Sequence, residues 1–337
     1  MNLRWLSSRN KYSQGDATCR LSRVKQIFVC RSRMQIVDLK IAFMGDSMKR
    51  TAVILAKLGL AILSVAIGAG AQTSGQPAPA QTTTPGAPAA PTAKRPPQAK
   101  TQPEFDAWKA ADANKADPAA LEKATNDFAT KFPDSELRVL LFKNAMRAYQ
   151  AANNSDKTEA MGRKVLGLDP DDPEALVVVA EVLAERTRDT DIDRDQRFAE
   201  AATMAQKATQ TIDTDISVPA GTPQDKIDAY KGVLRAQAFS IGGAIEYKKD
   251  DFAAAQESLQ KSIDAYPSDP DPVVVLRLAL ALDKQQKYPE ALKLANRAVE
   301  MTQDNTPIGT PARHERDRLQ QLTGGAARAQ PQTPPKN

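Results

Sequence analysis

The sequence contains little of the chemistry on which most enzymes depend. Only one histidine, His314, occurs among the 337 residues, and the only two cysteines, Cys19 and Cys30, lie near the start. Neither a G-x-S-x-G motif nor a glycine-rich phosphate-binding loop is present, although these are usual signatures of a serine nucleophile and a nucleotide site. We therefore expect a protein that is not an enzyme and that holds no cofactor.

Aromatic residues are also scarce, at 5%, and the net charge of +5 is unevenly distributed. Residues 1–71 hold twelve of the 46 Lys/Arg and three of the 41 Asp/Glu, so the remainder has a net charge of −4. A basic chain suggests nucleic acid as a partner, and a mildly acidic one does not. The charge therefore predicts that nucleic acid is not a partner of the main part of the chain.

A secretory signal peptide is predicted over residues 48–71, MKRTAVILAKLGLAILSVAIGAGA. A positively charged start, an apolar run and an A-x-A cleavage site that ends at Ala71 follow one another in order. We expect cleavage after Ala71 and a periplasmic or secreted protein. The alternative is an anchor in the inner membrane through residues 52–71, since about 20 residues can span a bilayer. Because a signal peptide normally begins the chain, we expect residues 1–47 to be either an upstream extension from a mis-assigned start or a disordered basic arm.

Two low-complexity segments flank the middle of the chain. Residues 72–103 are rich in Pro, Ala, Thr and Gln, and residues 323–337 have a similar composition. Such segments bury too little apolar surface to offset the entropy of ordering, so both are predicted to be disordered. Residues 104–322 show no strand alternation and are predicted to form one helical domain.

Small and apolar residues recur at helical spacing through this domain. Four series show the pattern: Leu121-Ala124-Phe128-Phe132, Phe198-Ala201-Ala205-Ala208, Phe252-Ala255-Leu259-Ile263 and Tyr288-Ala291-Ala295-Ala298. A capping side chain before a proline at the first helical position predicts a helix start. Four pairs of this kind occur, Asp117-Pro118, Asp172-Pro173, Thr222-Pro223 and Asp271-Pro272. A last helix is predicted from Pro311 to Leu322, with Leu319 and Leu322 facing inward and Gly324-Gly325 ending it.

Residues 236–269 and 272–305 contain the same unit. A small residue, an aromatic residue and an alanine occupy matching positions, namely Gly243, Phe252 and Ala255 in the first and Ala279, Tyr288 and Ala291 in the second. This unit resembles the tetratricopeptide repeat (TPR), a helix–turn–helix of 34 residues. Weaker versions start at residues 139 and 173, and a diverged fifth lies between Phe105 and Pro133. The resemblance implies an exported bacterial TPR-containing protein, an all-α right-handed solenoid of about four to five antiparallel helix pairs.

The resemblance further implies a non-enzymatic scaffold or adaptor that binds a peptide or helix of another protein. The partner would lie in a groove lined by the first helix of each unit. The groove positions are Lys143, Arg147, Gln150, Glu181, Ser240, Tyr247, Leu276 and Leu280. For each of them, ordinary packing or solvation is the alternative to a partner contact. A role as accessory factor in envelope assembly is a further alternative, because residues 131–136, KFPDSE, resemble a turn found in such repeat proteins.

One segment suggests a different chemistry. Asp189, Asp191, Asp193 and Asp195 alternate, and Glu200 follows at the spacing of a calcium-binding loop. Residue 194 is arginine where such a loop needs glycine, and four arginines lie among the acids. The segment is therefore either the site of a calcium-dependent binding module or a solvated insertion with internal ion pairs. We favour the insertion, and hence no bound metal.

Overall fold

The computed structural model describes residues 94–218 and 221–328. The predicted upstream extension, signal peptide and most of the Pro-rich segment lie outside these residues. Within them the chain forms helices and no strand. The helices are α2 (Gln102–Asp112), α3 (Pro118–Lys131), α4 (Arg138–Ala151), α5 (Ser155–Leu168), α6 (Pro173–Arg186), α7 (Arg194–Thr211), α8 (Gln224–Lys248), α9 (Phe252–Ala265), α10 (Pro272–Lys284), α11 (Tyr288–Glu300) and α12 (Gly309–Arg328).

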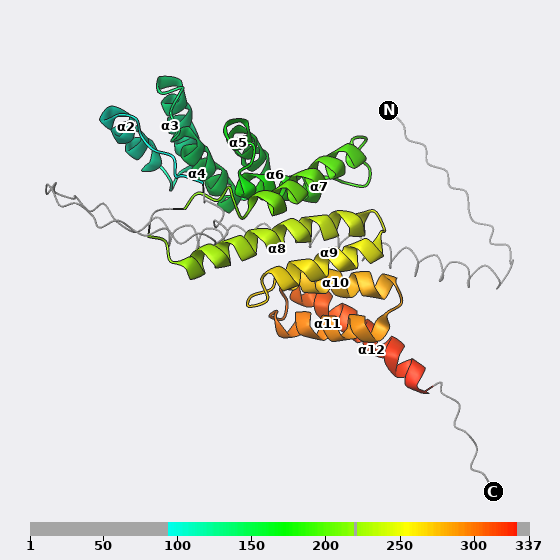
Figure 1. Cartoon of the computed structure of the whole chain (residues 1–337). Helices are drawn as coiled ribbons and strands as arrows, with labels where there is room; N and C mark the ends of the chain where they lie inside the picture. Colours follow the sequence, from blue (N-terminus) through cyan, green and yellow to red (C-terminus); the bar gives the residue numbers. More distant parts are fainter. Residues whose placement is uncertain (1–93, 219–220, 329–337) are drawn as a thin grey trace, which may run out of the picture. The chain divides into compact units, whose positions relative to one another are not determined.

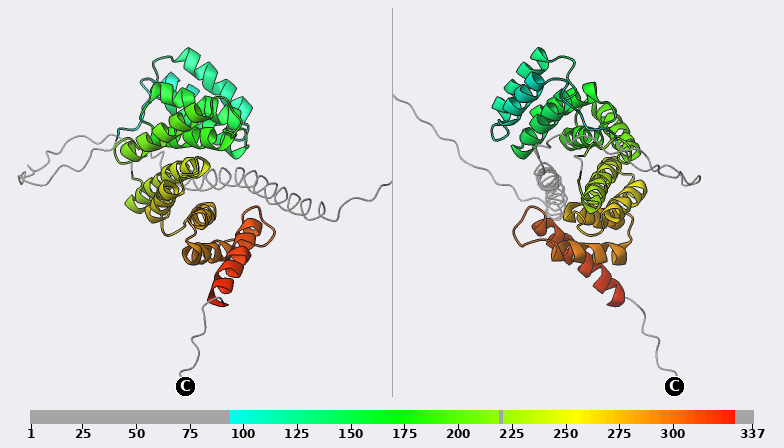
Figure 2. Two further views of the ribbon diagram at one scale, coloured as in Figure 1. Left: turned by 90° about the vertical axis from the view of Figure 1, so that its right-hand side faces the viewer. Right: turned by 60° about the vertical axis from the view of Figure 1, so that its left-hand side comes forward.

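These helices form five consecutive pairs, α2–α3, α4–α5, α6–α7, α8–α9 and α10–α11, followed by α12 (Figure 1). We call the first helix of each pair the A helix and the second the B helix. Each helix packs against the next one in sequence, and A helices also contact the A helix of a neighbouring pair, as α6 and α8 do. Figure 2 shows the helices from two further sides, in the colour order of the sequence. Contacts restricted to neighbouring units are typical of a repeat architecture. The predicted all-α stack of helix pairs is confirmed, and the described residues hold five pairs.

A repeated turn supports the assignment of units. The residue immediately before the B-helix N-cap has a positive φ in three pairs: Asn153 (55°), Asp250 (61°) and Gln286 (61°). This left-handed conformation is uncommon for residues other than glycine. Its recurrence at one position shows that these pairs share a single turn geometry. The α6–α7 pair lacks it, because a longer connection separates its two helices.

Three of the four predicted helix starts are confirmed. The side chains of Asp117, Asp172 and Asp271 accept hydrogen bonds from the first backbone N–H groups of α3, α6 and α10, each with proline in the first turn. The prediction for Thr222 was wrong. Helix α8 begins at Gln224, and its N-cap residue is Pro223, which offers no side-chain hydrogen bond. The pair Thr222-Pro223 therefore predicted the approximate start of α8 but not the residue that caps it.

The end of the last helix also differs from expectation. Leu319 is fully buried as predicted, but Leu322 is 41% exposed. Helix α12 continues through Gly324 and Gly325 to Arg328, past the expected domain boundary at residue 322. A glycine inside a helix costs only about 1 kcal/mol relative to alanine. Gly324 and Gly325 are therefore compatible with a helix end but do not force the helix to end there.

The weak unit starting at residue 139 is explained by its packing. Met146 occupies the position where the repeat has a small residue, and it is fully buried. The B helix compensates with Gly162, where an added Cβ would lie 2.5 Å from Val179 Cγ2 and 3.2 Å from Met146 Sδ. The small residue has moved from one helix to the other, and the close approach of the two helices is retained.

Adjacent glycines in α8 give a matched stability prediction. A Cβ at Gly243 would lie 2.6 Å from Leu259 Cγ, whereas a Cβ at Gly242 would meet only Ser258 Oγ, at 3.9 Å. We expect Gly243→Ala to destabilise the domain by about 1–3 kcal/mol through overpacking. Gly242→Ala should stabilise it by about 0.5–1 kcal/mol, because it only improves helix propensity. Urea unfolding of both variants tests this, and equal shifts of the midpoint would contradict it.

No helix in residues 94–218 and 221–328 combines the length and the apolar character that crossing a bilayer requires.

Candidate functional site

The A helices α4, α6, α8 and α10 line one surface, which we call the A-helix face. Two hollows lie on it. The N-terminal hollow, about 280 Å³, has residues of α2, α4, α6 and α8 in its wall, among them Trp108, Lys143, Arg147, Glu174 and Tyr230. The C-terminal hollow, about 90 Å³, lies among α6, α8, α9 and α10. Binding sites are generally concave and have a few polar groups in an apolar wall. These two hollows are therefore the candidate sites.

A buried ionic network forms the floor of the N-terminal hollow. The side chain of Glu174 is 1% exposed and accepts hydrogen bonds from Arg147 Nε (2.5 Å) and a second Arg147 nitrogen (2.6 Å). Lys143 Nζ lies 3.1 Å from Glu174 and 2.7 Å from Asp172. The hydroxyl of Tyr230 donates to Glu174 at 2.9 Å. Two cations and two carboxylates thus balance, and groups from three A helices are fixed together.

The pKa values follow from this pairing. Burial by itself raises the pKa of Glu174, but the charges of Arg147 and Lys143 outweigh it and hold the pKa below its usual range. Burial likewise lowers the pKa of Lys143, and Asp172 and Glu174 more than reverse that effect. These groups therefore stay charged near neutral pH, and the network is a structural tie between α4, α6 and α8.

Residues 94–101, which we call the strap, pack against the loops that join successive units. Lys94 Nζ lies 2.6 Å from Asp169 Oδ1, and Arg95 Nη2 lies 2.8 Å from Glu136 Oε1. The backbone N–H of Lys94 donates to Thr214 O at 3.2 Å. Pro96 and Pro97 line the N-terminal hollow. The end of the segment expected to be a disordered linker is therefore part of the folded domain, and it covers one side of this hollow.

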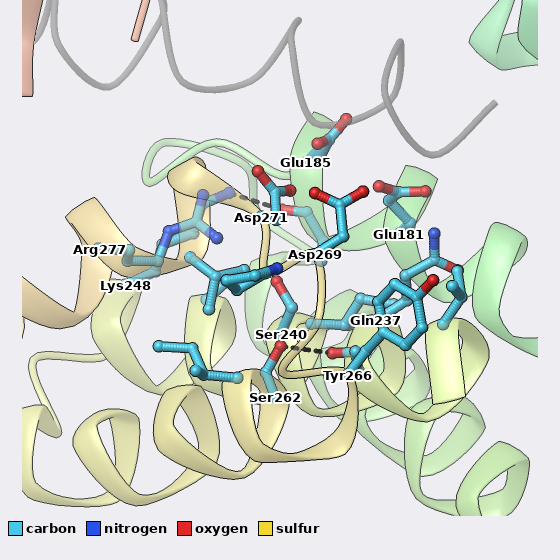
Figure 3. Close-up of a pocket in the computed structure, with 18 residues that line it drawn as sticks. Glu181, Glu185, Gln237, Ser240, Lys248, Ser262, Tyr266, Asp269, Asp271 and Arg277 are labelled. Carbon is cyan, nitrogen blue, oxygen red and sulfur yellow. Dashed lines mark hydrogen bonds between the residues drawn. The ribbon is translucent and has the colours of Figure 1, made fainter. Parts of the chain in front are cut away.

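The C-terminal hollow has a different character. Figure 3 shows the carboxylates of Glu181, Glu185, Asp269 and Asp271 gathered on one side of it, with Lys248 and Arg277 nearby. Apolar side chains complete the wall, with Val233, Ile241, Ala244 and Val274 among them. The hollow thus holds four acidic side chains and two basic ones.

Two acceptor atoms in this hollow lack hydrogen-bond donors. Glu185 Oε2 and Gln237 Oε1 are shielded from solvent, and neither has a hydrogen-bond partner among the described residues. Burial and the neighbouring charge of Glu181 raise the pKa of Glu185 well above its usual range. Buried acceptors without a donor are rare in folded proteins and cost free energy. A hydrogen-bond donor that entered the hollow could therefore satisfy these two oxygens.

The raised pKa of Glu185 predicts a pH-dependent effect of its replacement. The folded state retains the proton above pH 4.5, the ordinary value, where the unfolded state has lost it. Wild-type stability therefore falls as the pH rises from there through the folded-state pKa. We expect Glu185→Gln to be more stable than wild type near pH 7, with the difference vanishing at about pH 4. Thermal unfolding at both pH values measures this, and a difference independent of pH would contradict it.

The residues predicted to line the groove fall into three groups. Ser240 and Glu181 lie in the C-terminal hollow, and Lys143 and Arg147 in the N-terminal one, where their charges are neutralised. Leu276 is fully buried and Gln150 is 2% exposed, so neither offers surface to a partner in this state. Tyr247 is partly buried and packs edge-on against Phe252, and burial raises its pKa to about 12. Leu280 is partly buried.

The acidic segment between α6 and α7 distributes its carboxylates among separate partners. Asp191 accepts a hydrogen bond from the backbone of Arg188 (2.9 Å). Other ion pairs are Asp193 with Arg197 (2.8 Å), Asp189 with Arg194 (3.8 Å) and Glu200 with Arg163 of α5 (2.8 Å). The described part of the chain holds no group of three or more His, Cys, Asp or Glu side chains arranged for a metal ion. Two of these ion pairs, Asp189 with Arg194 and Asp193 with Arg197, lie within the segment itself.

Sequence reasoning missed three residues of these hollows. Glu174 lies in the first turn of α6, where an acid is ordinarily explained by the helix dipole. Tyr230 precedes the recognised unit, because α8 extends twelve residues upstream of residue 236. Glu185 lies one helical turn after Glu181, so the i,i+4 pair of like charges was a signal in the sequence. Such a pair is destabilising on an isolated helix and therefore points to a reason for keeping it.

Comparison with known proteins gives distant structural similarity only. No protein-family model matches the sequence, and no curated protein matches it. Among solved structures, a thermophilic TPR protein of Thermus thermophilus is similar at 12% identity and a TM-score of 0.40, covering 63% of this chain and 98% of that one. The assembly chaperone of RpL4 (Acl4) is similar at 12% identity and a TM-score of 0.37, covering 66% and 99%. These similarities are too distant to assign a family.

Proposed function

We propose that this protein is a non-enzymatic scaffold or adaptor whose A-helix face binds a segment of another protein. The observation that carries the proposal is the C-terminal hollow, which places unpaired acceptors and apolar walls together on that face. Repeat proteins use surfaces of this kind, built from successive units, to hold extended peptides or helices. The proposal is placed at the C-terminal hollow because the charged groups of the N-terminal hollow are already paired with one another.

The proposal includes action outside the cytoplasm, in the periplasm or after secretion. Its support is the predicted signal peptide at residues 48–71, which lies outside the described residues. Retention of residues 52–71 as an inner-membrane anchor is the alternative. Sequencing the N-terminus of the mature protein separates the two, because cleavage gives a chain that starts at Gln72.

Photo-cross-linking tests partner binding. A photoreactive phenylalanine derivative replaces Ser240 in the hollow, or Ala253, which is exposed on the B helix α9, as the control. We expect the full-length chain to form an adduct with another protein from position 240 and not from position 253. Equal adducts from both positions, or none from position 240, would contradict the proposal.

A further inference from the structure

The proposed function leaves open the chemistry of the bound segment, and the C-terminal hollow constrains it. We propose that this hollow binds the guanidinium group of an arginine side chain of the partner, between Glu185, Glu181 and Gln237. This inference rests on the proposed function and names the residue type that the site selects.

The charge of the hollow is the first argument. One of its two cations, Lys248, is already bound within the protein, because its Nζ donates to Ala184 O (2.5 Å) and Thr187 O (3.3 Å) at the end of α6. Burial lowers the pKa of Arg277, although Glu185 and Asp271 oppose this effect. Burying a charged group costs free energy unless the group is paired. The hollow holds more acidic than basic side chains, so an incoming cation would stabilise their charged forms.

The unpaired acceptors are the second argument, independent of charge. Glu185 Oε2 comes from α6 and Gln237 Oε1 from α8, so the two open positions lie on different helices. An ammonium is a compact point charge, whereas a guanidinium is a plane with five N–H donors in a fixed fork. A group that must satisfy acceptors on two helices at once matches the guanidinium better.

The size and the walls of the hollow are the third argument. A cavity of about 90 Å³ suits one side chain and is too small for a helix. Val233, Ile241, Ala244 and Val274 are apolar and lie among the carboxylates. The three methylene groups of arginine can pack against such a wall while the charged end reaches the acids.

Tyr266 adds an aromatic ring to the same hollow, from the residue that follows α9. Guanidinium groups stack on aromatic faces, a contribution worth about 0.5–1 kcal/mol at exposed sites. Stacking on the Tyr266 ring would therefore stabilise a bound guanidinium more than a neutral polar group.

A titration with two small probes tests this inference on the full-length chain without a known partner. Propylguanidinium carries the cation, and propylurea is its neutral isostere. We expect propylguanidinium to shift the side-chain amide resonance of Gln237 saturably, with an affinity at least about tenfold above that of propylurea. Equal affinities, or no shift with either probe, would overturn the inference. The proposed function would not fall with it, because cross-linking from position 240 tests partner binding separately.

A pair of variants assigns the binding to the two carboxylates. Glu181→Gln combined with Glu185→Gln preserves the shapes of the side chains, and we expect it to weaken propylguanidinium binding by at least about tenfold. Glu257→Gln, on the exposed face of α9, is the matched control and should leave the affinity unchanged. Wild-type affinity in the double variant would overturn the inference. The comparison of the two probes on wild type needs no variant, so misfolding of a variant would leave it valid.

Discussion

Glu174→Gln is expected to destabilise the domain by about 3–5 kcal/mol, because it removes one partner of a buried ion pair and leaves the others uncompensated. Glu174 is 1% exposed and is bound by Arg147, Lys143 and Tyr230. The midpoint of thermal unfolding should fall by on the order of 10 °C. Circular dichroism in the far ultraviolet, which reports helix content, measures it.

The expected pH dependence of Glu174 follows from the direction of its shift. Its folded-state pKa lies below the ordinary value of 4.5, so its stabilisation is fully present above that value and is lost as the pH falls through the folded-state pKa. The pKa of Lys143 is raised above 10.5, so its stabilisation is present below that value and is lost as the pH rises further. The cost of Glu174→Gln should therefore be constant between these limits.

A matched control for this variant is Asp127→Asn. Asp127 pairs with Lys123 one turn away, with the two side chains 65% and 80% exposed. Exposed pairs contribute about 0–1 kcal/mol, so this variant should unfold almost as wild type does. Similar destabilisation by both substitutions would contradict the structural role assigned to the network.

Phe198→Ala should also cost about 3–5 kcal/mol, through the cavity that it leaves. Phe198 is fully buried in the core formed by α6, α7 and α8. The charged ends of Arg194 and Lys248 lie 5.5 Å and 5.4 Å from its ring centroid, and these contacts would be lost too. Urea unfolding of the variant measures the effect.

Ile192→Ala is the control for Phe198→Ala, because it changes an apolar residue nearby in the chain, in the connection that leads into α7. Ile192 is fully exposed, and exposed substitutions usually change stability by less than about 0.5 kcal/mol. Equal destabilisation by Ile192→Ala and Phe198→Ala would contradict the assignment of Phe198 to the core and Ile192 to the surface.

The helix pairs could be predicted from sequence because their determinants are local. Aromatic and small residues recur at fixed helical steps, and Asp-Pro pairs mark three helix starts. Phe198 begins one of the predicted helical series, and its full burial supports that series. Helix ends were harder, because Gly324 is tolerated within α12.

The site depended on contacts that no local pattern encodes. Lys143 and Arg147 were recognised as neighbours on one helix face, but their partner Glu174 lies 27 residues beyond Arg147, and Tyr230 lies 56 further on. The sequence therefore placed these two cations on the groove without the carboxylates that neutralise them in the structure. The strap was missed for a related reason. Its composition predicts disorder, and only the positions of Asp169 and Glu136 in the fold show why the first residues of the strap are held.

The central claim is that the A-helix face binds a segment of another protein at the C-terminal hollow. The most direct measurement is the yield of cross-linked adduct from position 240 in a chain that also carries Glu181→Lys and Glu185→Lys, compared with Glu257→Lys on α9. We expect the reversal in the hollow to reduce the adduct by at least about tenfold, because like charges then oppose the partner, while the α9 variant cross-links as wild type does. An unchanged yield after reversal in the hollow would contradict the claim.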